Sequence, residues 1–290
     1  MKRSIDRPLA LITGGCGGIG MACAREFGRS HDLLLADMSA DRLAEFERQL
    51  RDEGYIIVGS VAGDLTDNSV IGSLMDRIKA HGSLKVLIHT AGISSALADW
   101  RTILKTNVLS TRRMLDAIEP HVTMGMVAVV LASIAGHLAP ADAEVDAILD
   151  TATTDDFLDS MESHLTRLAA MTAGNGTSFS YSGLSGPAYG VSKRATIRMA
   201  VKRSIGWAEK GARIVSISPG LIWTPMGRFE VDHGEAAAEV LAQTPLKRWG
   251  TAMDIAQAAR FLTSDMASFI TGTDLRIDGG MVPVRMDDKY

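Results

Sequence analysis

Short runs of consecutive apolar residues recur along the chain, and longer stretches of mixed polarity separate them. Seven runs occur, at Leu9–Ile12, Leu33–Ala36, Tyr55–Val61, Val86–Ile88, Val127–Leu131, Ile214–Ile217 and Leu275–Ile277. A run without polar alternation is typical of a strand that is buried on both faces of a sheet. Between the runs, residues 40–53 and 69–81 carry apolar residues at helical spacing. Strands that alternate with helices predict an α/β fold with a doubly wound parallel sheet of about seven strands.

One segment breaks this alternation. The stretch from Ser133, just after the fifth run, to Tyr189 is longer than a strand-to-helix loop requires. Within it, residues 137–180 carry eight acids and a single base, Arg167. No linker or repeat divides the 290 residues. We therefore expect a single domain over residues 1–290, with a helical insertion at about 137–180 that precedes a second helix at Tyr189.

The insertion itself predicts an amphipathic helix. Thr153 or Thr154 could cap it, and Asp155 and Asp156 would then lie in its first turn, where negative charge is favourable. The expected apolar stripe consists of Phe157, Met161, Leu165 and Leu168. Glycines within residues 174–176 would end the helix. We expect the stripe to bury against the following helix or a neighbouring subunit, and the acids to form a solvated face.

Composition and charge exclude several classes of protein. An apolar fraction of 46% and a charged fraction of 22% are ordinary for a globular protein. The net charge of −4, without a basic run, argues against a nucleic-acid partner. The apolar runs fall short of the ~20 residues of a membrane span, so we expect no membrane partner. Cys16 and Cys23 fit no zinc or redox spacing, which favours reduced packing thiols in the cytoplasm. The seven histidines show no metal-ligand spacing, and we expect no metal.

The first apolar run leads into a glycine-rich loop, Thr13-Gly14-Gly15-Cys16-Gly17-Gly18-Ile19-Gly20. Glycines allow a tight turn and a close approach of the backbone to a pyrophosphate, and a helix N-terminus presents free N–H groups to it. Asp37 closes the second run, 19 residues after Gly18. An acid ~20 residues beyond such a loop binds the ribose of a dinucleotide. The alternative is that Asp37 caps the next helix, although Ser39 could fill that role.

Asp37 also predicts which dinucleotide is bound. A carboxylate accepts hydrogen bonds from ribose hydroxyls and repels a 2′-phosphate. Two unit charges ~4 Å apart at an effective dielectric constant of ~20 interact by about 4 kcal/mol, or roughly three decades in affinity. No Arg or Lys lies in the glycine loop or directly after Asp37 to offset this repulsion. The predicted cofactor is therefore NAD rather than NADP.

Tyr189 and Lys193 are four residues apart on a predicted helix, so their side chains share one face. Hydride transfer between a secondary alcohol and NAD needs a group that accepts or donates the hydroxyl proton. The pKa of free tyrosine is about 10, and the ammonium group of Lys193 would lower it. Ser133 would donate a hydrogen bond to the substrate oxygen. Pro187 fits the first turn of this helix without loss of a hydrogen bond. In isolation, without the upstream motifs, the preferred interpretation of the pair would be a solvated Tyr and Lys.

Taken in order, these motifs resemble the short-chain dehydrogenase/reductase family over nearly the whole chain, which implies a Rossmann-type sheet. The family motif Asn-Asn-Ala-Gly appears here as His89-Thr90-Ala91-Gly92, a departure that concerns the support of the fourth strand. The resemblance implies four catalytic residues, namely Ser133, Tyr189, Lys193 and Asn107. The implied cofactor-binding residues are Gly14, Cys16, Gly17, Gly18, Ile19, Asp37, Asp64, Leu65, Ala91, Gly92, Tyr189, Lys193, Pro219, Ile222 and Thr224. It also gives Lys193 a contact with the nicotinamide ribose, and Asn107 a structural and proton-relay role.

The length of the insertion resembles one branch of the family, the bacterial 3-alpha-hydroxysteroid dehydrogenase/carbonyl reductase branch. In that branch the segment alters the usual subunit contact, so we expect a homo-oligomer of altered geometry. The expected function is an NAD-dependent oxidoreductase that interconverts a secondary alcohol and a ketone, on an apolar cyclic or hydroxysteroid-like substrate. The alternatives are a non-catalytic NAD-binding sensor and an NADP-type ketoreductase. Trp223, Met226 and Phe229 could line the substrate pocket or only pack their loop.

Overall fold

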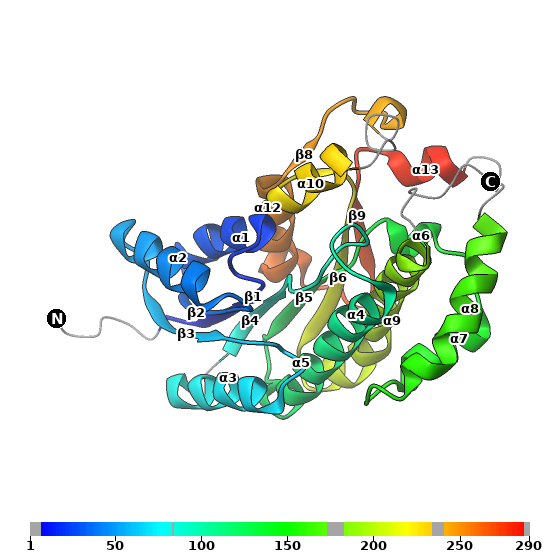
Figure 1. Ribbon diagram of the computed structural model, residues 1–290. Helices are drawn as coiled ribbons and strands as arrows, with labels where there is room; N and C mark the ends of the chain where they lie inside the picture. Colours follow the sequence, from blue (N-terminus) through cyan, green and yellow to red (C-terminus); the bar gives the residue numbers. More distant parts are fainter. Residues whose placement is uncertain (1–6, 83, 173–182, 234–240, 287–290) are drawn as a thin grey trace.

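A seven-stranded parallel sheet forms the centre of the computed structural model, which describes residues 7–82, 84–172, 183–233 and 241–286 (Figure 1). In the order β3-β2-β1-β4-β5-β6-β9, its strands are Ile57–Ala62, Asp32–Asp37, Leu9–Thr13, Leu84–His89, Val127–Leu131, Arg213–Pro219 and Asp274–Ile277. Two short strands, β7 (Ile222–Trp223) and β8 (Gly250–Thr251), pair separately. All seven apolar runs have become sheet strands, which confirms the predicted fold class.

Helices cover both faces of the sheet and make it a three-layer structure (Figure 1). One core forms under α1 (Gly18–Gly28), α2 (Ala40–Asp52) and α12 (Ala252–Thr263). The other forms under the helices α3 (Asn68–His81), α4 (Trp100–Leu104), α5 (Ser110–Ile118) and α9 (Ser185–Glu209). Successive residues of β1 alternate between the two cores, so a continuous apolar run is what a central strand needs. The shorter helices are η1 (Lys105–Leu109), η2 (Glu119–His121), α10 (Pro225–His233), η3 (Asp265–Ala267) and α13 (Met281–Met286).

The two edge strands correct the expectation that every run is buried on both faces. In β3 buried residues alternate with partly exposed ones, and in β9 Leu275 is 37% exposed. Each of these strands has one neighbour in the sheet. The sheet therefore buries its five inner strands more completely than its edges.

The chain reverses its direction of winding at β1, which pairs with β2 on one side and β4 on the other. Thr13, at the carboxyl end of β1, lies opposite Ala36 on β2 and His89 on β4. In open parallel sheets, ligands bind outside the carboxyl ends of the strands at such a switch point. The topology therefore places a crevice next to the glycine loop.

Between Ser133 and residue 172, where this part of the described chain ends, lie the helices α6 (Ala135–Leu138), α7 (Ala143–Thr151) and α8 (Phe157–Thr172), where the sequence predicted one. The predicted apolar stripe is buried in the same core as α9, as expected. However, α8 begins at Phe157, so Asp155 and Asp156 precede its first turn. The hydroxyl of Thr154 donates to Asp156 at 3.1 Å. The predicted end of the helix at residues 174–176 lies outside the described residues.

The acids of the insertion are paired, which makes the expectation of a merely solvated face wrong for α7. Its Asp146 carboxylate lies 2.9 Å from the Nε atom of Arg194 and 3.2 Å from Arg198. Asp150, one turn later, pairs with Arg198 and Lys202. All three cations belong to α9 and also follow at four-residue spacing. Two helices with matching i, i+4 rows of opposite charge can therefore pair along their length, and the insertion is anchored to α9.

Candidate active site

Two glycines allow loops from separate strands to meet at the switch point. Gly14 has a φ of +64°, and a Cβ atom there would lie 2.8 Å from the backbone nitrogen of Ala91. A Cβ atom on Gly18 would lie 2.6 Å from the side chain of Thr224. Both distances are shorter than van der Waals contact. The loops after β1, β4 and β6 therefore approach one another only because these positions carry no side chain.

Asp37 binds the glycine loop with one carboxylate oxygen, and its other oxygen accepts from the N–H of Ser39, which precedes α2, at 3.3 Å. Its Oδ2 atom accepts a hydrogen bond from the backbone N–H of Cys16 at 2.8 Å. Ser39 caps α2, so the alternative that Asp37 is the cap is wrong. Burial, with Asp37 nearby, raises the pKa of the Cys16 thiol to about 12, which keeps the thiol neutral.

Arg42 is a member of this site that sequence reasoning missed. Its guanidinium donates to the backbone carbonyl of Cys16, next to Asp37. Arg42 lies in the first turn of α2, five residues after Asp37, and its side chain reaches back over the loop. A basic residue in the first turn after Asp37 was the feature of the sequence that could have indicated this contact. A positive charge here partly offsets the carboxylate of Asp37.

Tyr189 and Lys193 project from the first turns of α9, in which Pro187 is the third residue. The Nζ atom of Lys193 donates to the carbonyl of Leu131, at the end of β5, at 3.1 Å. It lies 5.7 Å from the centre of the Tyr189 ring. Burial lowers the pKa of Lys193 to about 8, so the ammonium form still predominates at pH 7. Ser133 follows β5, and its Oγ atom accepts a hydrogen bond from the N–H of Ala135 at 3.2 Å.

Asn107 connects two of these elements. It lies in η1, a short π-helix, and its amide nitrogen donates to the carbonyl of Ile93 at 3.0 Å and to Ser192 at 3.1 Å. Its amide oxygen accepts from the N–H of Ile93 at 2.9 Å. The hydroxyl of Ser192 in turn donates to the carbonyl of Tyr189 at 2.8 Å. This arrangement supports the structural role that the resemblance implies for Asn107.

His89 continues this buried network to β1. Its Nδ1 atom lies 2.8 Å from the Thr13 hydroxyl, and its Nε2 atom lies 3.0 Å from the Thr111 hydroxyl. Thr111 donates its own proton to the carbonyl of Asn107 at 2.7 Å. We therefore assign the proton of His89 to Nε2, with Nδ1 as the acceptor. Thr90 adds a hydrogen bond to the carbonyl of Thr13 at 2.7 Å. His89 and Thr90 thus support β4 where the family motif has two asparagines.

The charge state of His89 leads to a prediction on stability. Burial, and then the charge of Lys193, lower the pKa of His89 to about 3. As the pH falls below about 6.5, the unfolded chain binds a proton that the folded chain excludes, so stability is lost toward pH 3. We expect His89→Asn to remove up to about 1.4 kcal/mol per pH unit of this acid sensitivity. Urea unfolding between pH 7.5 and 4 measures the slope.

The free energies of unfolding of wild type and His89→Asn above pH 7 serve as the control in this experiment. There His89 is neutral in both the folded and unfolded chains, so wild type and His89→Asn should show parallel pH profiles. Equal slopes below pH 6 as well would contradict the assignment of a buried neutral His89.

A cavity of about 700 Å³ joins the glycine loop to Ser133. Nine predicted cofactor-binding residues line it: Gly17, Gly18, Ile19, Gly92, Tyr189, Lys193, Pro219, Ile222 and Thr224. The other predicted residues are not among those that line it, namely Gly14, Cys16, Asp37, Asp64, Leu65, Ala91 and Asn107. Asp64 accepts a hydrogen bond from the N–H of Thr66 at 2.8 Å, beside the end of β3. Leu168 and Ala169 of α8 also line the cavity, and sequence reasoning missed this contribution.

Trp223, Met226 and Phe229, which follow β6, could line the substrate pocket or only pack their loop, and the structure divides them between these two roles. Met226 and Phe229 line the cavity. Trp223 is 53% exposed and packs edge-on against Trp249, with 5.3 Å between ring centres. The loop therefore supplies both an apolar wall and a separate aromatic contact.

The start of the insertion is tied to the last strand of the sheet. The Nε2 atom of His137 on α6 lies 2.7 Å from the carboxylate of Asp274 on β9. Ser216 and Ser218 of β6 donate their hydroxyls to the same carboxylate. Because α6 follows Ser133 directly, this contact helps to hold the loop that carries Ser133.

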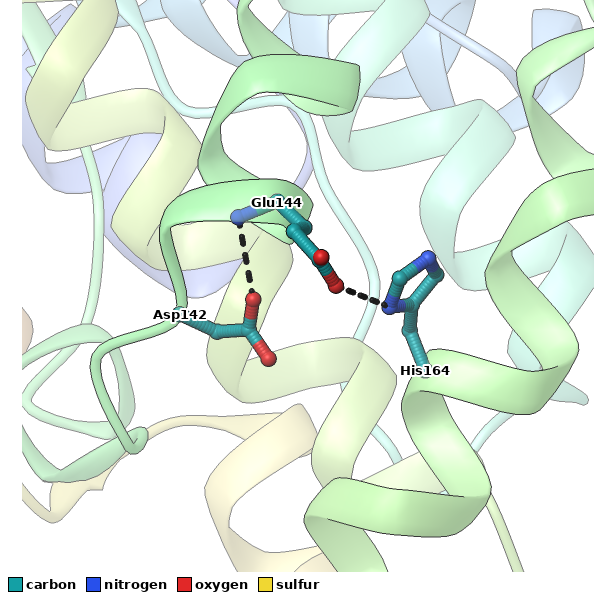
Figure 2. A group of neighbouring side chains, drawn as sticks. All are labelled: Asp142, Glu144 and His164. Carbon is teal, nitrogen blue, oxygen red and sulfur yellow. Dashed lines mark hydrogen bonds and ion pairs between the residues drawn. The ribbon is translucent and has the colours of Figure 1, made fainter.

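A cluster of possible metal ligands lies outside this cavity, in the insertion (Figure 2). It consists of Asp142, Glu144 and His164, with Glu144 3.8 Å from the ring of His164. The guanidinium of Arg167 already lies 2.7 Å from Asp142, 3.3 Å from Glu144 and 3.0 Å from His164. Arg167 thus supplies the positive charge that a metal ion would bring. We assign no metal to this cluster.

Within the described residues, none of the helices combines the length and the apolar character needed to span a membrane.

Known proteins resemble this chain along its whole length. The profile of the family described as "short chain dehydrogenase" matches residues 8–145, and that of "Enoyl-(Acyl carrier protein) reductase" matches residues 159–282. The chain is 31% identical to the short-chain dehydrogenase/reductase bsc3 of Alternaria brassicicola, over 93% of this chain and 94% of that protein. It is 27% identical to the cis-4-hydroxycyclohexanecarboxylate dehydrogenase of Sinomonas cyclohexanicum, over 98% and 100% respectively.

The fold leads to the same group of proteins. A solved structure of a short-chain type dehydrogenase/reductase from Mycobacterium ulcerans superimposes with a TM-score of 0.74 at 25% identity, over 96% of this chain and 91% of that chain. Sheet order, glycine loop and full-length similarity agree, and the chain belongs to the short-chain dehydrogenase/reductase family of oxidoreductases.

Proposed function

We propose that this chain is an NAD-dependent oxidoreductase that interconverts a secondary alcohol and a ketone on an apolar cyclic substrate. One observation carries the proposal, namely that a single cavity is lined by the glycine loop, Ser133, Tyr189 and Lys193. A hydride carrier held by the loop and a substrate beside Tyr189 would then share one space. The alternative of a non-catalytic sensor leaves the combination of Ser133, Tyr189 and Lys193 without a purpose.

The residues around the glycine loop fit a dinucleotide. The N-cap of α1 is Gly17, which has no side chain to bind the first-turn N–H groups. These N–H groups suit a pyrophosphate, because the positive end of the helix dipole adds to their attraction. Asp37 would accept hydrogen bonds from the adenosine ribose, and Lys193 would donate a hydrogen bond to the nicotinamide ribose. When bound, NAD would supply or accept the hydride.

In this proposal Tyr189 donates and accepts the proton of the reaction. In the reductive direction its hydroxyl donates a proton to the ketone oxygen, and in the oxidative direction the phenolate accepts the proton of the alcohol. The neighbouring ammonium of Lys193 stabilises the phenolate form. Ser133 donates a hydrogen bond that fixes the substrate oxygen. Asn107 positions the helix through Ser192, and we keep its proton-relay role as part of the proposal.

The lining of the cavity supports a neutral substrate. Among its described residues, the charged ones are Arg42 and Lys193, both beside the dinucleotide part of the site. The walls near Ser133 include Leu138, Met226 and Phe229. Apolar walls with a few convergent polar groups suit a hydrocarbon framework with one oxygen to be recognised. The name of the relative from Sinomonas cyclohexanicum describes a hydroxylated six-membered ring, which agrees with a cyclic framework, although that ring also bears a carboxylate.

Ketone-dependent oxidation of NADH tests the proposal. We expect purified protein to turn over cyclohexanone, a decalone or a 3-ketosteroid, measured by loss of absorbance at ~340 nm against a sample without ketone. NADH binding without turnover of any ketone, or of the matching alcohols with NAD, would favour the sensor instead.

One observation favours a second candidate, an NADP-type ketoreductase. The guanidinium of Arg42 beside Cys16 could attract a 2′-phosphate that Asp37 repels. We still favour NAD, because Arg42 is exposed to solvent, which screens its charge. We also propose a cytoplasmic homo-oligomer. Since α7 and α8 cover the outer side of α9, the subunits would meet on another face (Figure 1).

A further inference from the structure

The insertion reaches the cavity of the candidate active site. Leu168 and Ala169, near the carboxyl end of α8, line the same cavity as Ser133 and Tyr189. Leu165, one turn earlier, is completely buried in the core that α8 shares with α9. The helix therefore packs on α9 along part of its length and faces the cavity near its end.

Two sets of contacts fix α8 in this place. On one side α7 is paired with Arg194, Arg198 and Lys202 of α9, and α8 packs against α7 and α9. Figure 1 shows α7 and α8 as a pair beside α9. On the other side, ion pairs join residues around the start of α8 to the helices α4 and η1, which precede β5. Lys105 lies 2.7 Å from Asp155, and Arg101 lies 3.4 Å from Asp159. The insertion is thus an anchored wall and not a free flap.

Of the two residues of α8 that line the cavity, Ala169 has the smaller side chain. It is only partly exposed, whereas its neighbour Ala170 is exposed and does not line the cavity. A methyl group at this position leaves room that a larger side chain would fill. In an apolar pocket, a difference of one methylene changes discrimination between substrates by about 10-fold to 200-fold.

We infer that α8 sets the size limit of the substrate, with Ala169 as the specificity-determining residue that admits a multi-ring ketone. This inference rests on the proposed function, because it names which ketones the same site accepts. The small side chain leaves space for a fused second or third ring, whereas a single six-membered ring does not need that space.

Two variants with the same substitution on adjacent residues test the inference. Ala169→Trp should lower kcat/KM for a 3-ketosteroid at least about 10-fold relative to cyclohexanone. Ala170→Trp, which adds the same bulk to the exposed side of α8, should keep this ratio within about 2-fold of wild type. The KM for NADH should stay unchanged in both. If Ala169→Trp does not fold, as judged by circular dichroism, Ala169→Leu serves in its place. An unchanged steroid-to-cyclohexanone ratio in the folded Ala169 variant would overturn the inference.

Binding of an uncharged apolar dye separates this inference from the proposed function. We expect wild type and Ala170→Trp to bind Nile red with similar affinity, and Ala169→Trp to bind it at least about 10-fold more weakly. Equal affinities in the two variants would overturn the role of Ala169, whatever the activity. If wild type binds the dye but turns over no ketone, only the proposed function is rejected. Weaker binding of the dye by Ala169→Trp would still support the role of Ala169 in limiting the size of the ligand.

Discussion

Tyr189→Phe should lower ketone turnover by at least ~10²-fold while the affinity for NAD stays within a few-fold of wild type. The substitution removes one hydroxyl and keeps the ring, so the helix, Lys193 and the cavity walls are retained. What is lost is the proton donor, which acts in the transition state and contributes little to cofactor binding. Steady-state rates with a saturating cyclic ketone, and NADH fluorescence titrations, measure the two quantities.

Tyr55→Phe is the matched control for this experiment. Tyr55 is partly buried against the core on the side of α1 and α2, away from the cavity lining. The same loss of a hydroxyl there should leave turnover within about 2-fold, because only stability is affected. Turnover close to wild type in Tyr189→Phe would remove Tyr189 from the mechanism.

Wild type should prefer NAD over NADP by at least ~10²-fold, and Asp37→Ala should narrow this ratio by about 10-fold or more. The expected repulsion between the carboxylate and a 2′-phosphate is about 4 kcal/mol at ~4 Å, or roughly three decades. Arg42 beside Cys16 reduces this figure, so we expect less than the full effect. The ratio of kcat/KM for the two cofactors, measured with one ketone, gives the result.

Arg42→Ala provides the opposite change in the same loop. Without the guanidinium, the preference for NAD should widen, because the remaining charge next to the 2′ position is that of Asp37. The two variants together separate repulsion by the carboxylate from attraction by the arginine. Equal use of both cofactors by wild type would contradict the role proposed for Asp37.

Much of the fold could be predicted because buried parallel strands have a clear signature. Runs such as Leu33–Ala36 and Val127–Leu131 are apolar throughout, since helices cover both faces of the inner strands. The helix α7 was not predicted. Its buried apolar residues are few, with Val145 and Leu149 one turn apart, and acids lie directly beside both of them in the sequence. Those acids read as solvent-facing, whereas two of them face arginines 48 residues away in sequence.

The candidate site divides in the same way. Tyr189, Lys193 and the glycine loop follow from local spacing, because one helix or one turn positions each group. Arg42 and Ala169 were not predicted, since each reaches the cavity through the packing of a whole helix on another element. His89 is an intermediate case. Its departure from the family motif was visible, but its partner Thr111 lies on a different element and only the fold brings the two together.

The contact between His137 and Asp274 has a consequence for the order in which the parts of the protein fold during synthesis. β9 is the last strand of the sheet, and its Asp274 carboxylate is bound by Ser216, Ser218 and His137. A nascent chain that already contains Ser133, Tyr189 and Lys193 still lacks this carboxylate, and the outer edge of β6 is unpaired. Domains generally fold as units during synthesis. The loop that carries Ser133 therefore gains its contact with Asp274 only after the ribosome has released β9.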